Sequence, residues 1–202
     1  MNAENLTNID VAIEFSRPES AVENYKMCFS NKVPVVSGTT GWLESLPEII
    51  SLCEANKTGF FYASNFSLGV NLFFELNKKL AMLMNPFKEY SVRMNEIHHT
   101  RKLDAPSGTA ITLAEGIILN IDHITNWKNS EDVAQGELPI ISYREGEVPG
   151  THEVIYDSEI DTLSIKHEAK NRKGFALGAV LAAEFLKGKI GFYGMNDLLQ
   201  IS

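Results

Sequence analysis

The sequence predicts an α/β protein in which a parallel-sheet domain is followed by an α+β domain with a mixed or antiparallel sheet. In the first 70 residues, apolar strand patterns alternate with helical patterns, and this alternation is typical of a parallel sheet. From residue 91 onward, one helical pattern is accompanied by several strand patterns, which is typical of an α+β domain. With 202 residues and 44% hydrophobic composition, the chain is long enough to bury a sizeable core.

The first half of the chain begins with a strand pattern, "VAIEF" (11–15), of the kind that is buried on both faces. Ser16 and Glu19 then form a capping-box pattern, which predicts a helix start. Two more strands, "VPVVS" (33–37) and "GFFYAS" (59–64), flank a helical stretch around "LPEIISLCEAN". We therefore expect three parallel strands with helices between them.

Apolar residues at three- and four-residue spacing predict a further helix over 69–84. Beyond it, "SVRMNEIHH", "LPIISYR", "THEVIYD" and "DTLSIKHEA" alternate as strands do, and "SGTAITLAEGIIL" is helical. The last helix, "FALGAVLAAEFLKG" (175–188), is apolar and rich in Ala and Gly, which favours close packing on the first sheet. We expect one domain of residues 1–70 and 176–202 and a second of residues 71–175.

Charge and composition exclude several classes of protein. The net charge of -8 and the pI near 5.2 give no general attraction to nucleic acid or to anionic lipid, so we expect neither as a partner. The two cysteines, Cys28 and Cys53, show no metal or disulfide spacing, which favours a reducing compartment. The N-terminal residues "MNAENLTNID" show neither a basic region nor an apolar run, so we expect no leader, and no apolar run is long enough for a membrane span. These features predict a soluble, cytoplasmic protein.

The stretch "EIHHTRKLDAPSGTA" (96–110) gathers most of the chemistry in the sequence. His98 and His99 come at the end of a predicted strand, where successive side chains point to opposite faces. A polar strand end and a metal site are alternatives to catalysis, but no Cys or carboxylate pattern completes a metal site. We therefore expect no metal, and a histidine that can act as an acid.

The residues that follow favour anion binding. Lys102 is a movable cation, and "DAPSGTA" places Pro106, Ser107, Gly108 and Thr109 at a predicted helix N-terminus, whose N–H groups and dipole attract anions. Simple helix capping is the alternative for this turn. Next to the histidines, the pattern indicates a carboxylate-binding loop beside an acid.

Two loops follow strands of the predicted parallel sheet, "SGTTGW" (37–42) and "ASNFSLGVN" (63–71). Ligands of such sheets bind at this carboxyl edge, although each loop alone also fits an ordinary turn. The cationic run "HEAKNRKGF" (167–175) fits a solvated basic turn. No G-x-G-x-x-G follows the first strand and no acidic residue is available to hold a ribose, so the residues themselves do not demonstrate a dinucleotide site.

Taken together, these motifs resemble the 4-hydroxy-tetrahydrodipicolinate reductase family, also called dihydrodipicolinate reductase, of diaminopimelate and lysine biosynthesis. The block 96–110 resembles the signature of that family, and "EFSRPES", "GTTG", "ASNFSLGVN" and "KNRKGFALGA" resemble its other blocks in the same order. The resemblance covers essentially the whole chain. It implies a Rossmann-like domain, a substrate domain that also forms a homotetramer through its sheets, and reduction of a cyclic imine dicarboxylate with NADH or NADPH.

The resemblance also implies roles for individual residues. His98 matches the proton donor, and Lys102 matches a second catalytic or substrate-orienting cation. The substrate carboxylates are matched by His99, Ser107, Gly108 and Thr109. The cofactor loops are matched by Gly38, Thr39, Thr40, Ala63, Ser64, Asn65 and Phe66, and the flanking positions by Arg17, Arg172 and Phe175.

The start of the chain departs from the family pattern. Family members open with a strand, a Gly-rich phosphate loop and a helix, whereas this chain opens with "NAENLTNID" before a later strand. We therefore expect an incomplete Rossmann-like domain that leaves Val11, Ile13 and Phe15 at an uncovered edge. A shortened reductase is one interpretation. The alternative is a protein of the same fold that lacks the cofactor and only binds dicarboxylates or oligomerises.

Overall fold

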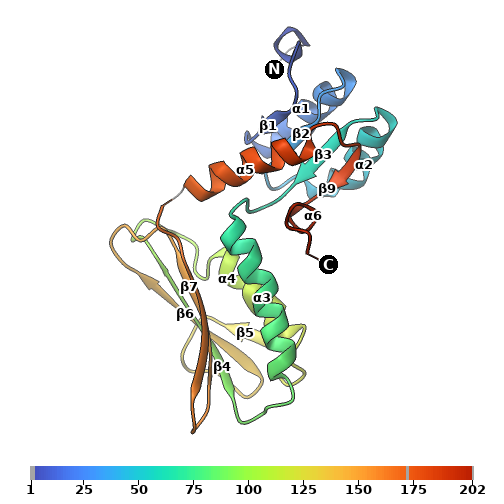
Figure 1. The fold of residues 1–202 in the computed structure, drawn as a ribbon. Helices are drawn as coiled ribbons and strands as arrows, with labels where there is room; N and C mark the ends of the chain where they lie inside the picture. Colours follow the sequence, from blue (N-terminus) through green and yellow to red (C-terminus); the bar gives the residue numbers. More distant parts are fainter. Residues whose placement is uncertain (1–2, 172, 202) are drawn as a thin grey trace. The chain divides into compact units, whose positions relative to one another are not determined.

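The computed structural model describes residues 3–171 and 173–201, and its contacts divide the chain into two compact units. Unit 1 comprises Met1–Asn71 and Lys173–Ser202, and unit 2 comprises Leu72–Arg172. Unit 1 contains a four-stranded parallel sheet, and unit 2 contains a five-stranded sheet with parallel and antiparallel pairs (Figure 1). The predicted α/β class, with a parallel sheet and a separate mixed sheet, is confirmed.

The parallel sheet of unit 1 has the strand order β1-β2-β3-β9. Its elements are η1 (Ala3–Leu6), β1 (Ala12–Glu14), α1 (Pro18–Ser30), β2 (Val35–Ser37), η2 (Leu43–Ser45), α2 (Leu46–Ala55), β3 (Gly59–Tyr62), α5 (Lys173–Leu186), β9 (Gly191–Tyr193) and α6 (Met195–Leu199). The sequence analysis did not predict β9 and α6.

Helices cover both faces of this sheet. On one face, Tyr25 and Phe29 of α1 pack with Phe60 of β3. On the other face, Ala179 and Ala182 of α5 pack in a cluster with residues of β2 and β3. Small residues let α5 approach the strands closely, so the predicted return of this helix to the first sheet is confirmed.

Two predictions concern the first strand: burial on both faces, and an uncovered edge at Val11, Ile13 and Phe15. The first is wrong, and the second holds for Ile13 and Phe15 only. The strand lies at the edge of the sheet, and Ile13 and Phe15 are 48% and 55% exposed, as expected for an uncovered edge and not for a strand buried on both faces. Val11, in contrast, packs against the cluster beneath α5. The capping box at Ser16 is wrong, because α1 begins after Arg17 without a side-chain cap, and the Ser16 hydroxyl donates to Glu14 instead.

Unit 2 has the strand order β5-β6-β4-β7-β8. Its elements are α3 (Leu68–Met84), which belongs to this unit from Leu72, and β4 (Ser91–His98), α4 (Gly108–Ile118), β5 (Asn126–Lys128), β6 (Glu137–Arg144), β7 (Thr151–Asp157) and β8 (Thr162–Glu168). The short strand β5 was not predicted. No helix in the described residues is long and apolar enough to cross a membrane.

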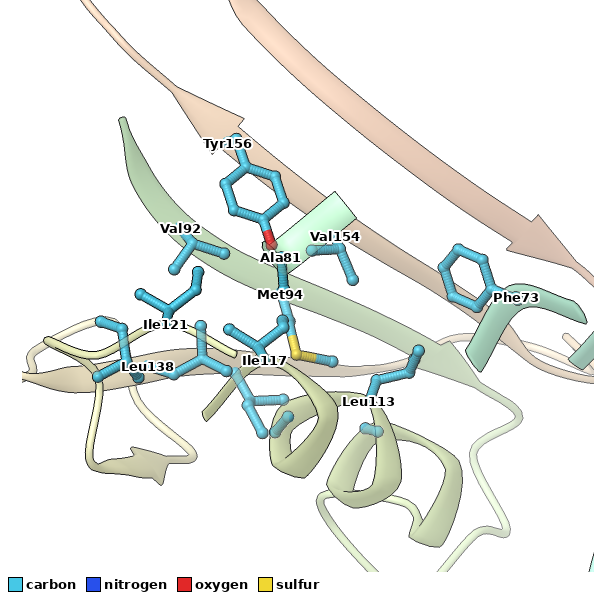
Figure 2. Packing of buried hydrophobic residues seen from close by; sticks show 14 residues of the cluster. Phe73, Ala81, Val92, Met94, Leu113, Ile117, Ile121, Leu138, Val154 and Tyr156 are labelled. Carbon is cyan, nitrogen blue, oxygen red and sulfur yellow. The ribbon is translucent and has the colours of Figure 1, made fainter. Parts of the chain in front are cut away.

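One face of the unit 2 sheet packs on α3 and α4. Figure 2 shows Leu113 and Ile117 of α4 beside Met94 of β4 in this cluster, and all three side chains are buried. Burial of each such side chain stabilises the fold by about 1.5–3 kcal/mol. Because side chains alternate along a strand, burying Val92 and Met94 directs Glu96 and His98 to the same inner face.

Candidate active site

The predicted acid lies at the last residue of β4. His98 is buried, and His99 follows the end of the strand and is half-buried. The strand therefore ends between the two histidines, so the strand pleat does not force them onto opposite faces. His98 shares its face with Glu96, a residue that the sequence analysis did not single out.

The Glu96 carboxylate is fully buried and is surrounded by donors. Its Oε2 lies 3.1 Å from His98 Nδ1, and its Oε1 accepts a hydrogen bond of 3.0 Å from Arg144 Nη2. The backbone N–H of Ser107 donates to both carboxylate oxygens. Burial alone would raise the pKa of Glu96, but these donors outweigh it and hold the pKa well below its usual range. Glu96 is therefore an anion at neutral pH.

The turn 106–109 leads into α4 as predicted. Ser107 is the N-cap, and its hydroxyl accepts a hydrogen bond of 3.2 Å from the N–H of Ala110. Gly108 is the first helical residue, and a Cβ added to it would meet nothing within 4 Å. Thr109 follows in the first helical turn and is half-buried. The Ser107 side chain caps the helix, and the space beside Gly108 leaves the helix N-terminus accessible. An anion can bind to the free N–H groups there.

Lys102 lies in the turn between β4 and α4. Its ammonium is 2.8 Å from Asp104 Oδ1, and this hydrogen bond lowers the pKa of Asp104. The Lys102 side chain is only 22% exposed, and its backbone N–H donates to the carbonyl of His99. A partly buried cation is thus held a few residues from His98.

His152 is a second buried histidine in this cluster, and the sequence analysis missed it. Its Nε2 lies 3.0 Å from the Ser107 hydroxyl, and its ring is 5.1 Å from the ring of His98. Burial lowers the pKa of His152 to about 3, and the nearby His98 acts in the same direction, so the ring is uncharged near neutral pH. The alternation in "THEVIYD", which places His152 on the same face as Val154, could have indicated its burial.

The same cluster offers metal-ligand atoms, contrary to the expectation that no carboxylate would complete such a site. Glu96, His98 and His152 each place one ligand atom within 4.8 Å of the others. Arg144 already occupies the Glu96 carboxylate, however, and a divalent ion would have to compete with that guanidinium. The donor set therefore fits an ion-paired network better than a metal centre.

In unit 1, the predicted cofactor loops lie next to each other at the carboxyl edge of the parallel sheet. Gly38–Thr40 follow β2 and Ala63–Phe66 follow β3, and the N–H of Ala63 donates to the carbonyl of Ser37. Thr39, Ala63 and Phe66 are buried, whereas Thr40 and Ser64 are exposed. Arg17 follows β1 at the same edge and is exposed. Ligands of parallel sheets bind at such an edge.

Glu14 holds one of these loops in place. This buried carboxylate at the end of β1 accepts hydrogen bonds from Thr39 Oγ1 at 2.8 Å and from Ser37 Oγ at 3.0 Å. Burial raises the pKa of Glu14, but the hydrogen bonds from Ser16, Thr39 and Ser37 outweigh it and lower the pKa overall. The carboxylate therefore anchors the start of the loop at Gly38–Thr40.

A cavity of about 420 Å³ opens at the same edge, in the size range of small-molecule sites. Its lining combines the loop after β3 with the segment after β9: Tyr62, Ala63, Ser64, Asn65, Asn71, Phe192, Gly194, Met195, Asn196 and Asp197. The mixture of aromatic, amide and backbone groups fits part of a dinucleotide. The segment 194–197 was not predicted, because nothing local indicates that β9 joins this sheet.

The remaining flanking positions are Phe175 and Arg172. Phe175 lies in the first turn of α5 and is 42% exposed, and Arg172 lies outside the described residues. Further along this helix, Gly178 touches the cofactor loop: a Cβ there would lie 1.7 Å from the carbonyl oxygen of Phe66. A glycine is thus required at 178 for α5 to lie against the loop.

We expect Gly178→Ala to displace the Phe66 backbone, to destabilise the protein by about 1–3 kcal/mol and to weaken dinucleotide binding. Gly174→Ala is the matched control in the same helix, because its Cβ would meet only the Ser67 hydroxyl, at 3.9 Å. Urea unfolding and a dinucleotide titration of both variants test this. Equal effects of the two substitutions would contradict the contact at Gly178.

Two family models match the chain. "Dihydrodipicolinate reductase, N-terminus" matches residues 2–66, and "Dihydrodipicolinate reductase, C-terminus" matches residues 69–199. We expected the N-terminal domain to be incomplete. The family model for this domain nevertheless matches residues 2–66, from the start of unit 1 through β3 and the loop after it.

Individual relatives agree with these matches. The 4-hydroxy-tetrahydrodipicolinate reductase of Christiangramia forsetii is 53% identical over 191 residues, covering 95% of this chain and 80% of the relative. The enzyme of the same name from Neisseria meningitidis is 33% identical, covering 98% of this chain and 75% of the relative. A solved structure, dipicolinate-bound dihydrodipicolinate reductase from Paenisporosarcina sp. TG-14, matches with a TM-score of 0.76 and 28% identity over 98% of this chain and 77% of that chain.

Proposed function

Because this chain belongs to the dihydrodipicolinate reductase family, we propose that it reduces the cyclic imine dicarboxylate 4-hydroxy-tetrahydrodipicolinate to tetrahydrodipicolinate with NADH or NADPH, in diaminopimelate and lysine biosynthesis. The observation that carries the proposal is the cluster at the end of β4. There a buried histidine, a partly buried lysine and an open helix N-terminus lie within one short stretch of chain.

We assign substrate binding to the turn between β4 and α4. The open backbone at Gly108 and Thr109 and the positive end of the α4 dipole favour one carboxylate of a dianionic ring. His99 and Lys102 supply polar and cationic contacts for the ring, and Ser107 holds the turn through its cap. Dipicolinate, the ligand of the Paenisporosarcina enzyme, is a dicarboxylate of this kind.

We assign proton transfer to His98. A dinucleotide held by unit 1 would supply a hydride, and the carbon next to the reduced position would then need a positioned acid. His98 has the required chemistry, and Glu96 lies behind it to stabilise a positive charge on the ring. Lys102 adds a second positive charge, which offsets the developing negative charge of the substrate.

We assign dinucleotide binding to unit 1. The loops at Gly38–Thr40 and Ala63–Phe66 border the edge at which such sheets bind nucleotides, and the 420 Å³ cavity beside the second loop fits part of the cofactor. Arg17 and Phe175 are exposed near the ends of β1 and α5 and would flank it. Unit 2 would then serve as the substrate and oligomerisation domain.

We also propose a homotetramer formed through the sheet of unit 2. The sheet face opposite α3 and α4 carries Ile97, Ile141 and Tyr143, and Tyr143 is 40% exposed. These apolar side chains, together with the polar Arg93 and Asn95 on the same face, would form the contact with another copy. The cytoplasmic location expected from the cysteine content stays a prediction.

The test is a titration of NADH and NADPH into this chain, followed by nicotinamide fluorescence with and without pyridine-2,6-dicarboxylate. We expect saturable binding that the dicarboxylate strengthens, and turnover of the imine substrate. Dicarboxylate binding by a folded chain that binds neither dinucleotide would instead favour the alternative of a cofactor-free binding protein. Absence of binding of both ligands would contradict the proposed function.

A further inference from the structure

The proposed site is built around Glu96, a buried carboxylate to which neither the family signature nor the sequence analysis gave a role. Its side chain has no exposed surface and lies on the inner face of β4, two residues before His98. A buried carboxylate is costly unless charged and polar partners compensate for the lost water. Its partners therefore indicate what the residue is there to do.

Those partners belong to three separate parts of the site. Nδ1 of His98, the proposed acid, lies 3.1 Å from Oε2, and the N–H of Ser107 in the substrate-binding turn lies 3.1 Å from the same oxygen. Arg144 of β6 lies 3.0 Å from Oε1, and it also donates to the Asp104 carbonyl at 2.6 Å. One carboxylate thus joins the acid, the anion-binding turn and a cation that holds the intervening loop.

We propose, on the basis of the reductase function above, that Glu96 is a positioning residue that keeps a proton on His98 Nδ1, so that Nε2 is the atom that delivers the proton to substrate. His98 Nδ1 lies at ion-pair distance from Oε2 without meeting hydrogen-bond geometry, and because a carboxylate is only an acceptor, its negative charge at this distance favours a proton on Nδ1. A histidine oriented in this way keeps its Nδ1 proton while the Nε2 proton leaves. The same carboxylate sets the position of Ser107, and hence of the turn, relative to the acid.

The surroundings of Nε2 agree with this assignment. A Cβ added to Gly150 would lie 3.1 Å from His98 Nε2, so the residue next to this nitrogen has no side chain to crowd it. Gly150 also has a φ of 153°, which disfavours residues with a side chain. Nδ1 therefore faces a buried anion, and Nε2 faces backbone without a side chain.

The Glu96→Gln variant tests whether Glu96 controls the proton on His98 or only fills a buried space, because glutamine has nearly the same size and shape. The amide of the variant has one accepting and one donating end, whereas Arg144 and the Ser107 N–H only donate. The amide oxygen must therefore turn toward those two donors, which leaves the NH₂ group facing His98 Nδ1. The ring proton should then move from Nδ1 to Nε2, and the ring can no longer deliver a proton from Nε2 and keep one on Nδ1.

The experiment compares wild type, Glu96→Gln and Glu89→Gln in the full chain. Glu89 is an exposed glutamate in the turn before β4 and serves as the matched control. Long-range ¹H–¹⁵N spectra of the histidine rings should show His98 protonated on Nδ1 in wild type and Glu89→Gln, and on Nε2 in Glu96→Gln. The kcat of Glu96→Gln should fall by about 10²-fold, while its KM for the dinucleotide stays unchanged.

A second variant guards against loss of folding. Glu96→Asp keeps a charged acceptor for Arg144 but is one methylene shorter, so the carboxylate withdraws from the acid or from the turn. It should keep the Nδ1 proton and lose between about 10-fold and 100-fold in kcat. A wild-type tautomer in Glu96→Gln, or wild-type kcat in either folded variant, would overturn the proposal. Inactive wild type would count against the reductase function instead, and the tautomer would still decide the role of Glu96.

Discussion

Replacing both His98 and Lys102 with glutamine is expected to remove turnover and to leave the fold intact. His98 is the last residue of β4 and points to the inner face, and Lys102 lies in the following turn, so neither substitution opens a large cavity. A positioned acid contributes about 10²–10⁴-fold to the rate, and the cation adds stabilisation of developing charge, so the double variant should lose at least about 10³-fold in kcat/KM. Steady-state oxidation of NADH or NADPH with the imine substrate measures this loss.

The control for this experiment exchanges the same residue types elsewhere in unit 2. His123 and Lys88 are both exposed, and His123→Gln with Lys88→Gln should leave turnover unchanged. Circular dichroism should show that both double variants are folded like the wild type. Full activity in the folded His98, Lys102 double variant would remove the assignment of the active site.

Acid is expected to destabilise this protein through His152, beginning at a pH above that at which carboxylates protonate. Burial keeps the folded-state pKa of His152 near 3, against 6.5 for an unperturbed ring. Between these values the unfolded state binds a proton that the folded state rejects. Stability from this residue is therefore complete above about pH 6.5 and is lost at about 1.4 kcal/mol per pH unit as the pH falls. From pH 6.5 to 4.5, the free energy of unfolding should drop by about 2–3 kcal/mol.

His152→Gln isolates this contribution, because glutamine keeps a polar group near the Ser107 hydroxyl but does not titrate in this range. Burial also lowers the pKa of His167, which pairs with His152 across β7 and β8, so some acid sensitivity should survive in the variant. Urea unfolding of both proteins between pH 7.5 and 4.5 gives the comparison. Parallel pH profiles of wild type and His152→Gln would show that His152 does not carry the effect.

Local patterns predicted much of this molecule because local sterics and burial decide them. The βα alternation predicted β1, β2 and β3 as parallel strands, and the block 96–110 placed His98, Lys102 and Ser107 between one strand end and one helix cap. The capping box at Ser16 failed for the opposite reason. Its hydroxyl found a better partner in the Glu14 carboxylate, which only the folded sheet edge places beside it.

The sequence by itself determined the α/β class, the two loops at the carboxyl edge and the residues of the 96–110 turn. Only the tertiary structure decided which residues from other strands contact the residues of this turn. Arg144 is 48 positions from Glu96, and His152 is 45 from Ser107, so no local spacing connects them. They meet because β4 pairs with β6 in parallel and with β7 antiparallel, in a register that sets Arg144 opposite His98 and His152 opposite Glu96. Strand register depends on how whole faces are buried, and that is a property of the assembled sheet.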